Sequence, residues 1–426
     1  MDLPEHVEGL LRELAPQTLA ALVRRYGHFD LAEDAVQEAL LAAAQAWPGA
    51  LPDNPAGWLV TVASRRLTDL LRSEQARRRR EETEFVREVP LTATDGGVPE
   101  AGGRVVRDAD DSLVLLFLCC HPALTPPAQV ALTLRAVGGL TTAEIARGLL
   151  LPEGTVTRRI SRAKQRILDA GGRFEPPSSH DWPRRLDVVL HVLYLVFTEG
   201  HTATAGDALV RADLCDEAIR LARLVRRLLP AEPEVAGLLA LMLLVDARRA
   251  ARTAQDGALV PLAEQDRDRW DRAKIDEGIA LVTEALGRRR PGPYQLQAAV
   301  NAVHDEAESD AATDWPQILA LYGVLDALAD DPVVTLNRAV ALARVEGASA
   351  GLALLDTVAA EPRLAGHHRV HAVRAHLLAA AGRVDEAAGE FRLAARGTLS
   401  TPERRYLLER AAGHGVSRER PRPSPP

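Results

Sequence analysis

The segment that decides the fold is LTTAEIARGLLLPEGTVTRRISRAKQRI, which spans residues 140–167. Its first part predicts a short helix whose N-terminal cap is Thr141 or Thr142, and Pro152 supplies the break after it. The residues that follow, 153–168, predict a second helix. Two helices joined by a short turn are typical of a helix-turn-helix, although an ordinary pair of packed helices has the same outline.

The second of these helices has two different faces. Its apolar residues recur at helical spacing and form one stripe, made of Val156, Ile160, Ala163 and Ile167. The far side is polar and basic, with Thr155, Arg158, Arg162, Gln165 and Arg166. A helix that is basic on its exposed face suits the major groove of DNA, so this asymmetry favours the helix-turn-helix over the plain helix pair.

The distribution of charge agrees with that choice. The whole chain has a net charge of −7, but residues 121–174 carry +5 between the flanks 1–120 and 175–426, which carry −7 and −5. A basic island of this kind often marks contact with a polyanion, and a solvated helix face is the plainer alternative.

Upstream of the basic island, the sequence predicts an amphipathic helix that begins near Asp30. Asp30 followed by Glu33 three residues later resembles a capping box. The buried stripe is expected to contain Val36, Leu40, Ala43 and Trp47. The opposite face carries Asp34, Glu38 and Gln45. Two carboxylates four residues apart repel slightly in an isolated helix. A basic protein partner would relieve that repulsion, and a solvated face is the alternative.

Pro48 and Pro52 end this helix, and Pro55 can open the next one. The next helix is expected to bury Leu59, Ala63, Leu67 and Leu70. Its other side carries Trp58, Thr61, Arg65, Thr68 and Arg72. An aromatic ring and arginines on one exposed face suit single-stranded nucleic acid, where bases stack and cations follow the phosphates. The alternative is that Trp58 is simply a core residue.

The remaining helical block is rich in alanine and leucine. Near its end, small and aromatic residues have the spacing of the latter part of a tetratricopeptide repeat: Gly382, Ala387, Phe391 and Ala394. Gly347 lies 35 residues upstream of Gly382, in a weaker copy of the same pattern. We therefore expect paired helices, with degenerate copies before these two.

Composition completes the outline of an all-α chain. Apolar residues make up 47% and aromatic residues only 4%, which favours packed helices, and no segment shows sustained strand alternation. The predicted parts are a first domain at 5–88, a linker at 89–107, a second domain at 108–170, a linker at 171–182, a helical extension at 183–412 and a disordered tail at 413–426.

Several classes of protein are disfavoured. The apolar runs are too short to span a bilayer, the N-terminal segment lacks the apolar core of a secretory signal, and three cysteines do not make a disulfide scaffold. We therefore expect a cytoplasmic protein without a membrane partner. No enzymatic motif and no cofactor or metal site is expected either.

Two groups of polar residues are expected to be structural. Cys119-Cys120-His121 lacks the spacing of a zinc site, so we expect a packed helix end there. His191, Glu199 and His201 lie close together in the sequence and are expected to make structural hydrogen bonds.

These segments resemble a known family. AEDAVQEALLAAAQAW (32–47) and NPAGWLVTVASRRLTDLLR (54–72) are similar to region 2 of bacterial sigma factors of the extracytoplasmic-function group, and residues 140–167 are similar to region 4. The two regions stand in the family's order, and the middle sigma region is missing, as in other members of the group. CCHPALTPPAQVALTLRAVGGLTTAEIA (119–146) and HVLYLVFTEGHTAT (191–204) resemble the subgroup that bears a long tetratricopeptide-like extension.

The resemblance implies roles for residues of the first domain. The acidic helix would dock on the clamp helices of the polymerase β′ subunit through Asp34, Gln37 and Glu38. The loop after that helix would hold a base flipped from the −10 promoter element, and melted DNA would lie beside it. The residues implied for −10 binding are Asp53, Asn54, Trp58, Arg65 and Arg66.

The resemblance also implies roles in the helix-turn-helix. The residues that would face the major groove of the −35 element are Thr157, Arg158, Ser161 and Arg162. Arginine can read guanine there through two hydrogen bonds. The residues that would hold phosphates or flank the groove are Arg159, Lys164 and Arg166, and Thr155 is also assigned to −35 binding. Thr157 departs from the family pattern, because many relatives carry a basic residue at that position.

The implied function is that of an RNA polymerase sigma factor. It would bind core polymerase at the β′ clamp helices and the β flap, recognise promoter DNA and start transcription without catalysing a bond change. Members of the subgroup are generally not paired with a membrane anti-sigma factor, and the extension, which could bind a protein or peptide, is thought to take over regulation. The alternatives are a tetratricopeptide scaffold with a vestigial DNA-binding head and a ligand-responsive helix-turn-helix regulator.

Overall fold

The computed structural model describes residues 5–85, 108–170 and 177–415, apart from positions 27, 49, 139, 150, 330, 363, 365 and 366. Its regular structure is helical except for two short strands, β1 (Ala205–Gly206) and β2 (Leu399–Ser400), which pair in parallel. The all-α prediction is therefore confirmed. Within these residues, no helix combines the length and the apolar character that a membrane crossing requires.

The predicted domain limits meet the described residues only in part. The linker at 89–107, the first half of the linker at 171–182 and the last part of the tail lie outside them. α18 (Thr401–Gly415) continues past 412, where the extension was predicted to end. The contacts divide the chain into two units, Met1–Val192 and Leu193–Pro426, and the division falls within α8 (Trp182–His201).

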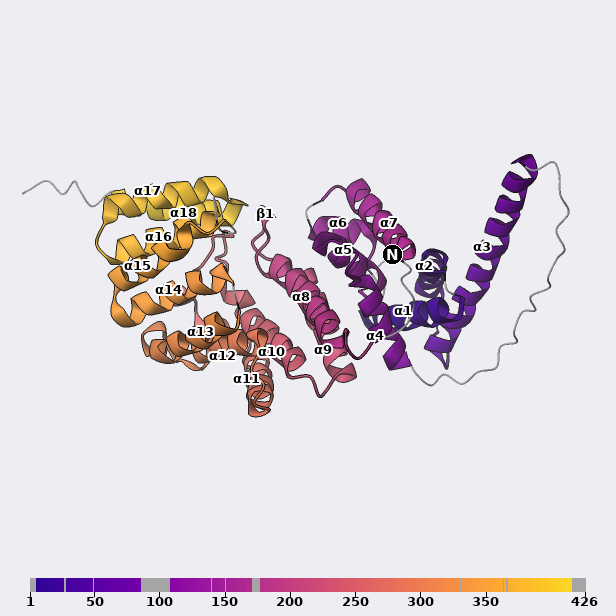
Figure 1. Ribbon diagram of the computed structural model, residues 1–426, viewed down its shortest axis with the longest axis horizontal. Coiled ribbons are helices and arrows are strands. Elements are labelled where there is room, and N and C mark those ends of the chain that lie inside the picture. Colours follow the sequence, from indigo (N-terminus) through magenta and orange to yellow (C-terminus); the bar gives the residue numbers. More distant parts are fainter. Residues whose placement is uncertain are drawn as a thin grey trace, which may run out of the picture. The chain divides into compact units, whose positions relative to one another are not determined.

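The first unit contains two groups of helices. In the first group, α1 (Glu5–Tyr26), α2 (Phe29–Ala46) and α3 (Pro55–Phe85) pack on one another. The second group consists of α4 (Asp108–Cys119), α5 (Pro126–Ala136), α6 (Thr142–Gly148) and α7 (Glu153–Asp169). The groups meet where α4 and α5 pack on α1 (Figure 1). The start of α8 joins them, because the Trp182 ring lies 4.9 Å from the Phe117 ring and Arg185 donates a hydrogen bond to the Phe117 carbonyl oxygen.

Burial in the first group follows the predicted stripes. The buried members are Val36 and Ala43 of α2, Trp47 directly after it, and Leu59, Ala63 and Leu67 of α3. Leu40 and Leu70 are only half-buried. The prediction that Asp30 caps this helix is wrong, because α2 begins at Phe29 and Asp30 already lies in its first turn. Glu33, the supposed partner in that cap, points into the protein instead.

A buried carboxylate joins the two groups of the first unit. Glu33 accepts hydrogen bonds from Arg135 Nε at 2.6 Å and from Lys164 Nζ at 2.8 Å, and Lys164 Nζ also lies 3.1 Å from Asp30. The Glu33 side chain is only 4% exposed and the Lys164 side chain 11%. Burial by itself lowers the pKa of Lys164, but Glu33 and Asp30 raise it above its ordinary value, so the ammonium stays charged.

The second unit is a series of helices in which most pack on the next. After α8 come α9 (Ala212–Leu228), α10 (Pro233–Ala247), α11 (Arg272–Gly287), α12 (Pro293–Glu306), α13 (Trp315–Leu328), α14 (Pro332–Glu346), α15 (Ala348–Ala359), α16 (His368–Ala380), α17 (Val384–Gly397) and α18. Short 3-10 turns lie at Arg249–Ala251, Leu262–Glu264, Arg267–Arg269 and Asp310–Ala312. In Figure 1 the helices from α11 to α18 follow one another as stacked layers.

The tetratricopeptide-like pattern is confirmed in the last helix pairs. Gly347 and Gly382 have positive φ angles of 97° and 78°, and they form the turns from α14 to α15 and from α16 to α17. A residue with a side chain would be strained in that backbone conformation, which explains glycine at both turns. Ala387, Phe391 and Ala394 are fully buried in the core that these helices share.

The buried carboxylate gives a test of how the first unit is held together. We expect Glu33→Gln to lower the free energy of unfolding by about 3–5 kcal/mol, because the two cations, Arg135 and Lys164, would lose the negative charge with which both are paired. Glu38→Gln on the same helix is the matched control. Glu38 pairs with Arg66 at 3.3 Å, but the two side chains are 52% and 56% exposed, so this loss should be about 0–1 kcal/mol.

Urea unfolding of the full chain, followed by circular dichroism, measures both variants. Small and equal losses for Glu33→Gln and Glu38→Gln would contradict the role given to Glu33.

Candidate nucleic-acid interface

The start of α6 is fixed by a reciprocal cap. The backbone N–H and the hydroxyl of Thr141 donate to Glu144 Oε2 at 2.7 and 2.8 Å, and the Glu144 backbone N–H donates to Thr141 Oγ1 at 3.2 Å. This geometry confirms Thr141 as the cap, and the helix begins at Thr142. After the break at Pro152, α7 begins at Glu153, as the sequence predicts.

α7 presents a basic face away from its buried stripe. Val156, Ile160, Ala163 and Ile167 are buried, which confirms the stripe. The exposed side chains of α7 include Thr157, Arg158, Ser161, Arg162, Gln165 and Arg166, while Thr155 and Arg159 are half-buried. Arg158, Arg162 and Arg166 recur every four residues and so form a single basic ridge.

Lys164 lies apart from this ridge. Its ammonium is bound by Glu33 and Asp30 of α2, so a phosphate would have to displace carboxylates that are already in place. The spacing of residues along α7 already indicated that Lys164 lies apart from the ridge. Lys164 follows Ile160 by four residues, at the border of the buried stripe, whereas Arg158 and Arg162 stand on the far side of the helix.

The loop before α3 is held by a side-chain cap. Asn54 Oδ1 accepts a hydrogen bond from the Gly57 backbone N–H at 2.9 Å, and the Trp58 backbone N–H donates to the Asn54 carbonyl oxygen at 3.0 Å. Asn54 and Pro55 therefore start α3 together. This capping role was not among the sequence-based predictions, although Asn followed by Pro before an apolar helix is a sufficient signal. Asp53 and Asn54 are both exposed on this loop.

Trp58 has features of both interpretations, a core residue and an exposed stacking surface. Its side chain is half-buried, and its ring packs edge to face against the buried Trp47, with centroids 5.6 Å apart. Part of the ring thus belongs to the core, and part is accessible. Arg65 and Arg66 are exposed further along α3, and Arg66 pairs with Glu38 of α2 at 3.3 Å.

The polar face of α2 carries the residues predicted to bind polymerase. Asp34 and Glu38 are exposed, and Gln37 is half-buried. Partial burial, followed by the neighbouring charge of Glu33, raises the pKa of Asp34. Leu41 is 63% exposed one turn after Gln37 and Glu38, and sequence reasoning did not select it. Leu41 gives this polar face an apolar side chain that a partner could contact. Its exposure is apparent only once the packing of the neighbouring residues is known.

Cys119 and Cys120 lie at the end of α4 in the core of the first unit. Both are buried free cysteines, and Cys120 Sγ lies 3.7 Å from Thr133 Oγ1. Burial raises the pKa of Cys120 to about 12, so its thiol is protonated at neutral pH. The prediction of a packed helix end is confirmed.

Three family models match the chain. Residues 10–77 match sigma-70 region 2, residues 115–167 match sigma-70 region 4, and residues 185–286 match a family of unknown function, DUF6596. The first match covers the core of the α1–α3 group. The second contains the basic ridge of α7, and the third runs from α8 to α11.

Relatives extend these matches over most of the chain. An uncharacterized protein of Rhizobium meliloti (strain 1021) is 44% identical over 395 residues, which is 92% of this chain and 92% of that protein. The crystal structure of yeast Tom70 aligns over 96% of this chain and 86% of that chain, with 13% identity and a TM-score of 0.37, too low to support an argument. On the two sigma-70 regions and the region that follows them, the chain belongs to the sigma-70 family, as a sigma factor of the extracytoplasmic-function type with a C-terminal extension.

Proposed function

We propose that this sigma factor binds core RNA polymerase, recognises −10 and −35 promoter elements and directs transcription initiation under the control of its C-terminal extension. The observation that carries the proposal is the basic ridge of α7, which lies inside the region 4 match and faces away from the buried stripe. We further propose that it acts in the cytoplasm, without a cofactor, and catalyses no bond change itself.

The ridge suits duplex DNA at the −35 element. A major groove about 12 Å wide admits one helix, and arginine can hydrogen-bond two acceptors of a guanine edge there. The proposed base-reading residues are Thr157, Arg158, Ser161 and Arg162. The proposed phosphate contacts at the margins are Thr155, Arg159 and Arg166. Lys164 can join these contacts only after it leaves Glu33 and Asp30.

Arg158 tests the groove assignment. The promoter is first mapped by transcription of genomic DNA with core polymerase. On it, Arg158→Ala should weaken the free energy of promoter binding by about 1–3 kcal/mol and relax specificity at one −35 position. Arg166→Ala is the control on the same ridge, and it should weaken all −35 variants evenly. The measurement is in vitro transcription from a set of single-base −35 variants. If Arg158→Ala ranks these variants as the parent does, Arg158 does not read a base.

The start of α3 is proposed to hold melted −10 DNA. Asp53 and Asn54 are exposed on a loop that the Asn54 cap ties to the start of α3, and a preorganised loop suits the capture of a flipped base. The accessible part of the Trp58 ring offers a stacking surface, and Arg65 and Arg66 supply nearby positive charge.

Trp58 separates base stacking from core packing. Trp58→Ala should reduce transcription from a duplex promoter, and a template with a pre-melted −10 bubble should recover part of the loss, because the ring is then needed for less of the opening. Trp58→Phe, which keeps an aromatic face, is the control and should retain more activity on the duplex. Equal losses on both templates, with a lowered melting temperature, would assign Trp58 to the core alone.

The exposed face of α2 is proposed to bind the β′ clamp helices. Asp34, Gln37 and Glu38 supply polar groups for a basic partner, and Leu41 adds an apolar contact beside them. The ion pair between Glu38 and Arg66 is no obstacle, because an exposed pair of this kind is worth only about 0–1 kcal/mol. The helices of region 4 would meet the β flap.

The extension is proposed to support the active arrangement of the sigma factor with polymerase. Its removal should therefore abolish promoter-specific transcription. A cut after residue 172 would also remove Trp182 and Arg185 and uncover the buried Phe117, so the cut belongs after Val192. The test compares residues 1–192 with the full chain in transcription with core polymerase, and circular dichroism verifies that the shorter chain is helical. Activity of residues 1–192 equal to that of the full chain would exclude control by the extension.

A further inference from the structure

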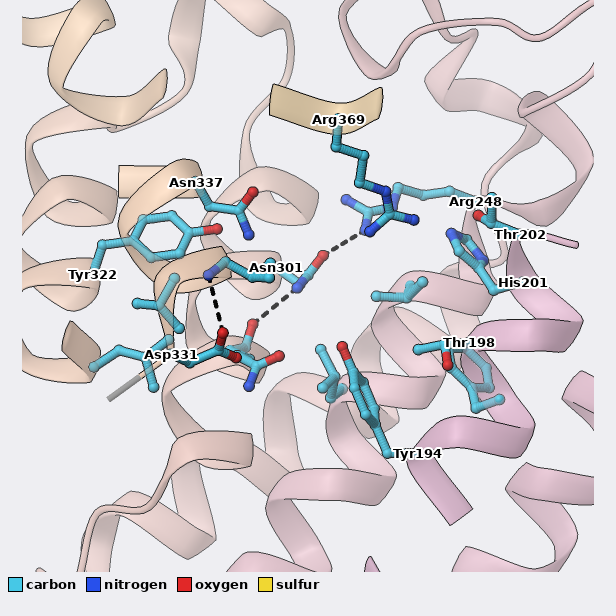
Figure 2. A pocket seen from close by; sticks show the side chains of 17 residues that line it. Tyr194, Thr198, His201, Thr202, Arg248, Asn301, Tyr322, Asp331, Asn337 and Arg369 are labelled. Atoms are coloured by element: carbon cyan, nitrogen blue, oxygen red, sulfur yellow. Dashed lines mark hydrogen bonds between the residues drawn. The ribbon is translucent and has the colours of Figure 1, made fainter. Parts of the chain in front are cut away.

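A cavity of about 390 Å³ lies among the helices of the second unit (Figure 2). Residues of α8 and α10 form one part of its lining, residues of α12, α13, α14 and α16 form another, and Thr202, Arg248 and Asp331 add to it from the segments between helices. The lining residues of α8 and α10 lie inside the DUF6596 match, whereas α12 to α16 lie outside it. The cavity therefore lies between two parts of the extension, and its volume is in the range of small-molecule sites.

Two arginines from different helices enter this cavity. Arg248 follows the end of α10, Arg369 lies in the first turn of α16, and Figure 2 shows both side chains pointing inward. Arg248 donates to Asn301 Oδ1 and lies 3.3 Å from the buried carboxylate of Asp305. The atom that faces Asp305 is Arg248 Nη1, which forms an ion pair there but no hydrogen bond among the described residues. Arg369 is exposed at the cavity, so its guanidinium group can donate to a ligand, whereas the charge of Arg248 is shared with Asp305.

His201 lines the cavity beside these arginines. The His201 Nδ1 atom is buried without a hydrogen-bond partner in the described residues, so the structural bond expected from the sequence is absent at this atom. The ring stacks on Phe197, with centroids 5.8 Å apart. Burial lowers the pKa of His201 well below its ordinary value, and the charges of nearby arginines, Arg248 and Arg369 among them, lower it further. The imidazole is therefore neutral at physiological pH.

The rest of the lining contributes one negative charge and several neutral groups. Burial raises the pKa of Tyr322 to about 12 and also raises that of Tyr194, so both phenols stay neutral. Asp331 is the acidic residue of the lining, and its Oδ1 accepts a hydrogen bond from the Val333 backbone N–H at 2.9 Å. The charged residues of the lining are therefore two arginines and one aspartate, and Asp305, behind the lining, offsets part of the charge of Arg248.

We propose that this cavity is a binding site for a carboxylate, which Arg369, Arg248 and the His201 ring would hold. Guanidinium groups bind carboxylates through two parallel N–H···O bonds. A carboxylate monoanion fits better than a phosphate dianion, because Asp331 and Asp305 already offset part of the arginine charge and a second negative charge would be buried without a partner. The two tyrosines would flank the body of the ligand. The carboxylate belongs either to a small organic acid or to the C-terminus of a peptide.

The test is isothermal titration calorimetry on the purified full chain. The sample contains neither polymerase nor DNA, so the outcome of the titration is independent of the proposed function. The probes are N-acetyl-leucine, the acetylated peptide Ser-Ala-Tyr-Ala-Leu with a free C-terminus, the same peptide with a C-terminal amide, and inorganic phosphate. We expect at least one of the two carboxylates to bind and the amide and phosphate not to bind.

The probes also separate the two sources of the carboxylate. Binding of the free peptide alone assigns the site to peptide C-termini, and binding of N-acetyl-leucine assigns it to small organic acids. The absence of binding by both carboxylates, or equal binding by the amide or by phosphate, overturns the proposal.

A pair of variants on α16 places the binding in this cavity. Arg369→Gln should weaken the bound carboxylate by about tenfold or more, because a charged hydrogen bond is lost. Arg374→Gln is the control, since Arg374 pairs with Asp356 at 2.6 Å and does not line the cavity. Arg369 is exposed, so its loss should leave the melting temperature unchanged. Unchanged affinity in Arg369→Gln, or equal losses in the two variants, overturns the proposal.

Discussion

The arrangement of the first unit depends on one buried carboxylate. Glu33 is almost completely removed from water, and a charge in that position is stable only when cations and hydrogen bonds replace the lost solvent. Both of its partners come from the second group of helices, Arg135 from α5 and Lys164 from α7. The carboxylate of a region 2 helix thus links region 4 at two points, and it decides which of the cations of α7 are left at the surface.

That division gives lysine and arginine different roles in one helix. Lys164 is one of only two lysines in the chain, and its compact ammonium is placed between two carboxylates. Arg158 and Arg162 stand on the other side, exposed, where a planar guanidinium can form paired hydrogen bonds with a base. The net charge of +5 in residues 121–174 therefore overstates what DNA can meet, because part of it is neutralised within the protein.

Features that depend on neighbours in the sequence were predictable, and features that depend on distant residues were not. The stripe of α7, the Thr141 cap and the turn glycines follow from local spacing. Glu33 was mistaken for half of a cap because its real partners lie 102 and 131 residues away. The cavity of the extension combines side chains from six helices and the segments between them, and no stretch of sequence brings them together. The exposure of Arg158 and Arg162 followed from helical periodicity, and the same periodicity placed Lys164 at the border of the buried stripe, but not the carboxylates that bind it.

Charge is balanced differently around the cavity than around Glu33. Glu33 has two cations within 2.8 Å, whereas Asp305 has Arg248 at 3.3 Å, and both Asp305 oxygens lack a hydrogen-bond partner among the described residues. Burial therefore raises the pKa of Asp305 to about 6, although Arg248 opposes the shift. Below that pH the protonated carboxyl is favoured in the fold, and above it the buried charge costs stability. The incomplete pairing of Asp305 and Arg248 and the unpartnered His201 Nδ1 therefore distinguish the surroundings of the cavity from the fully paired Glu33, and perturbed buried groups of this kind are enriched where proteins bind ligands.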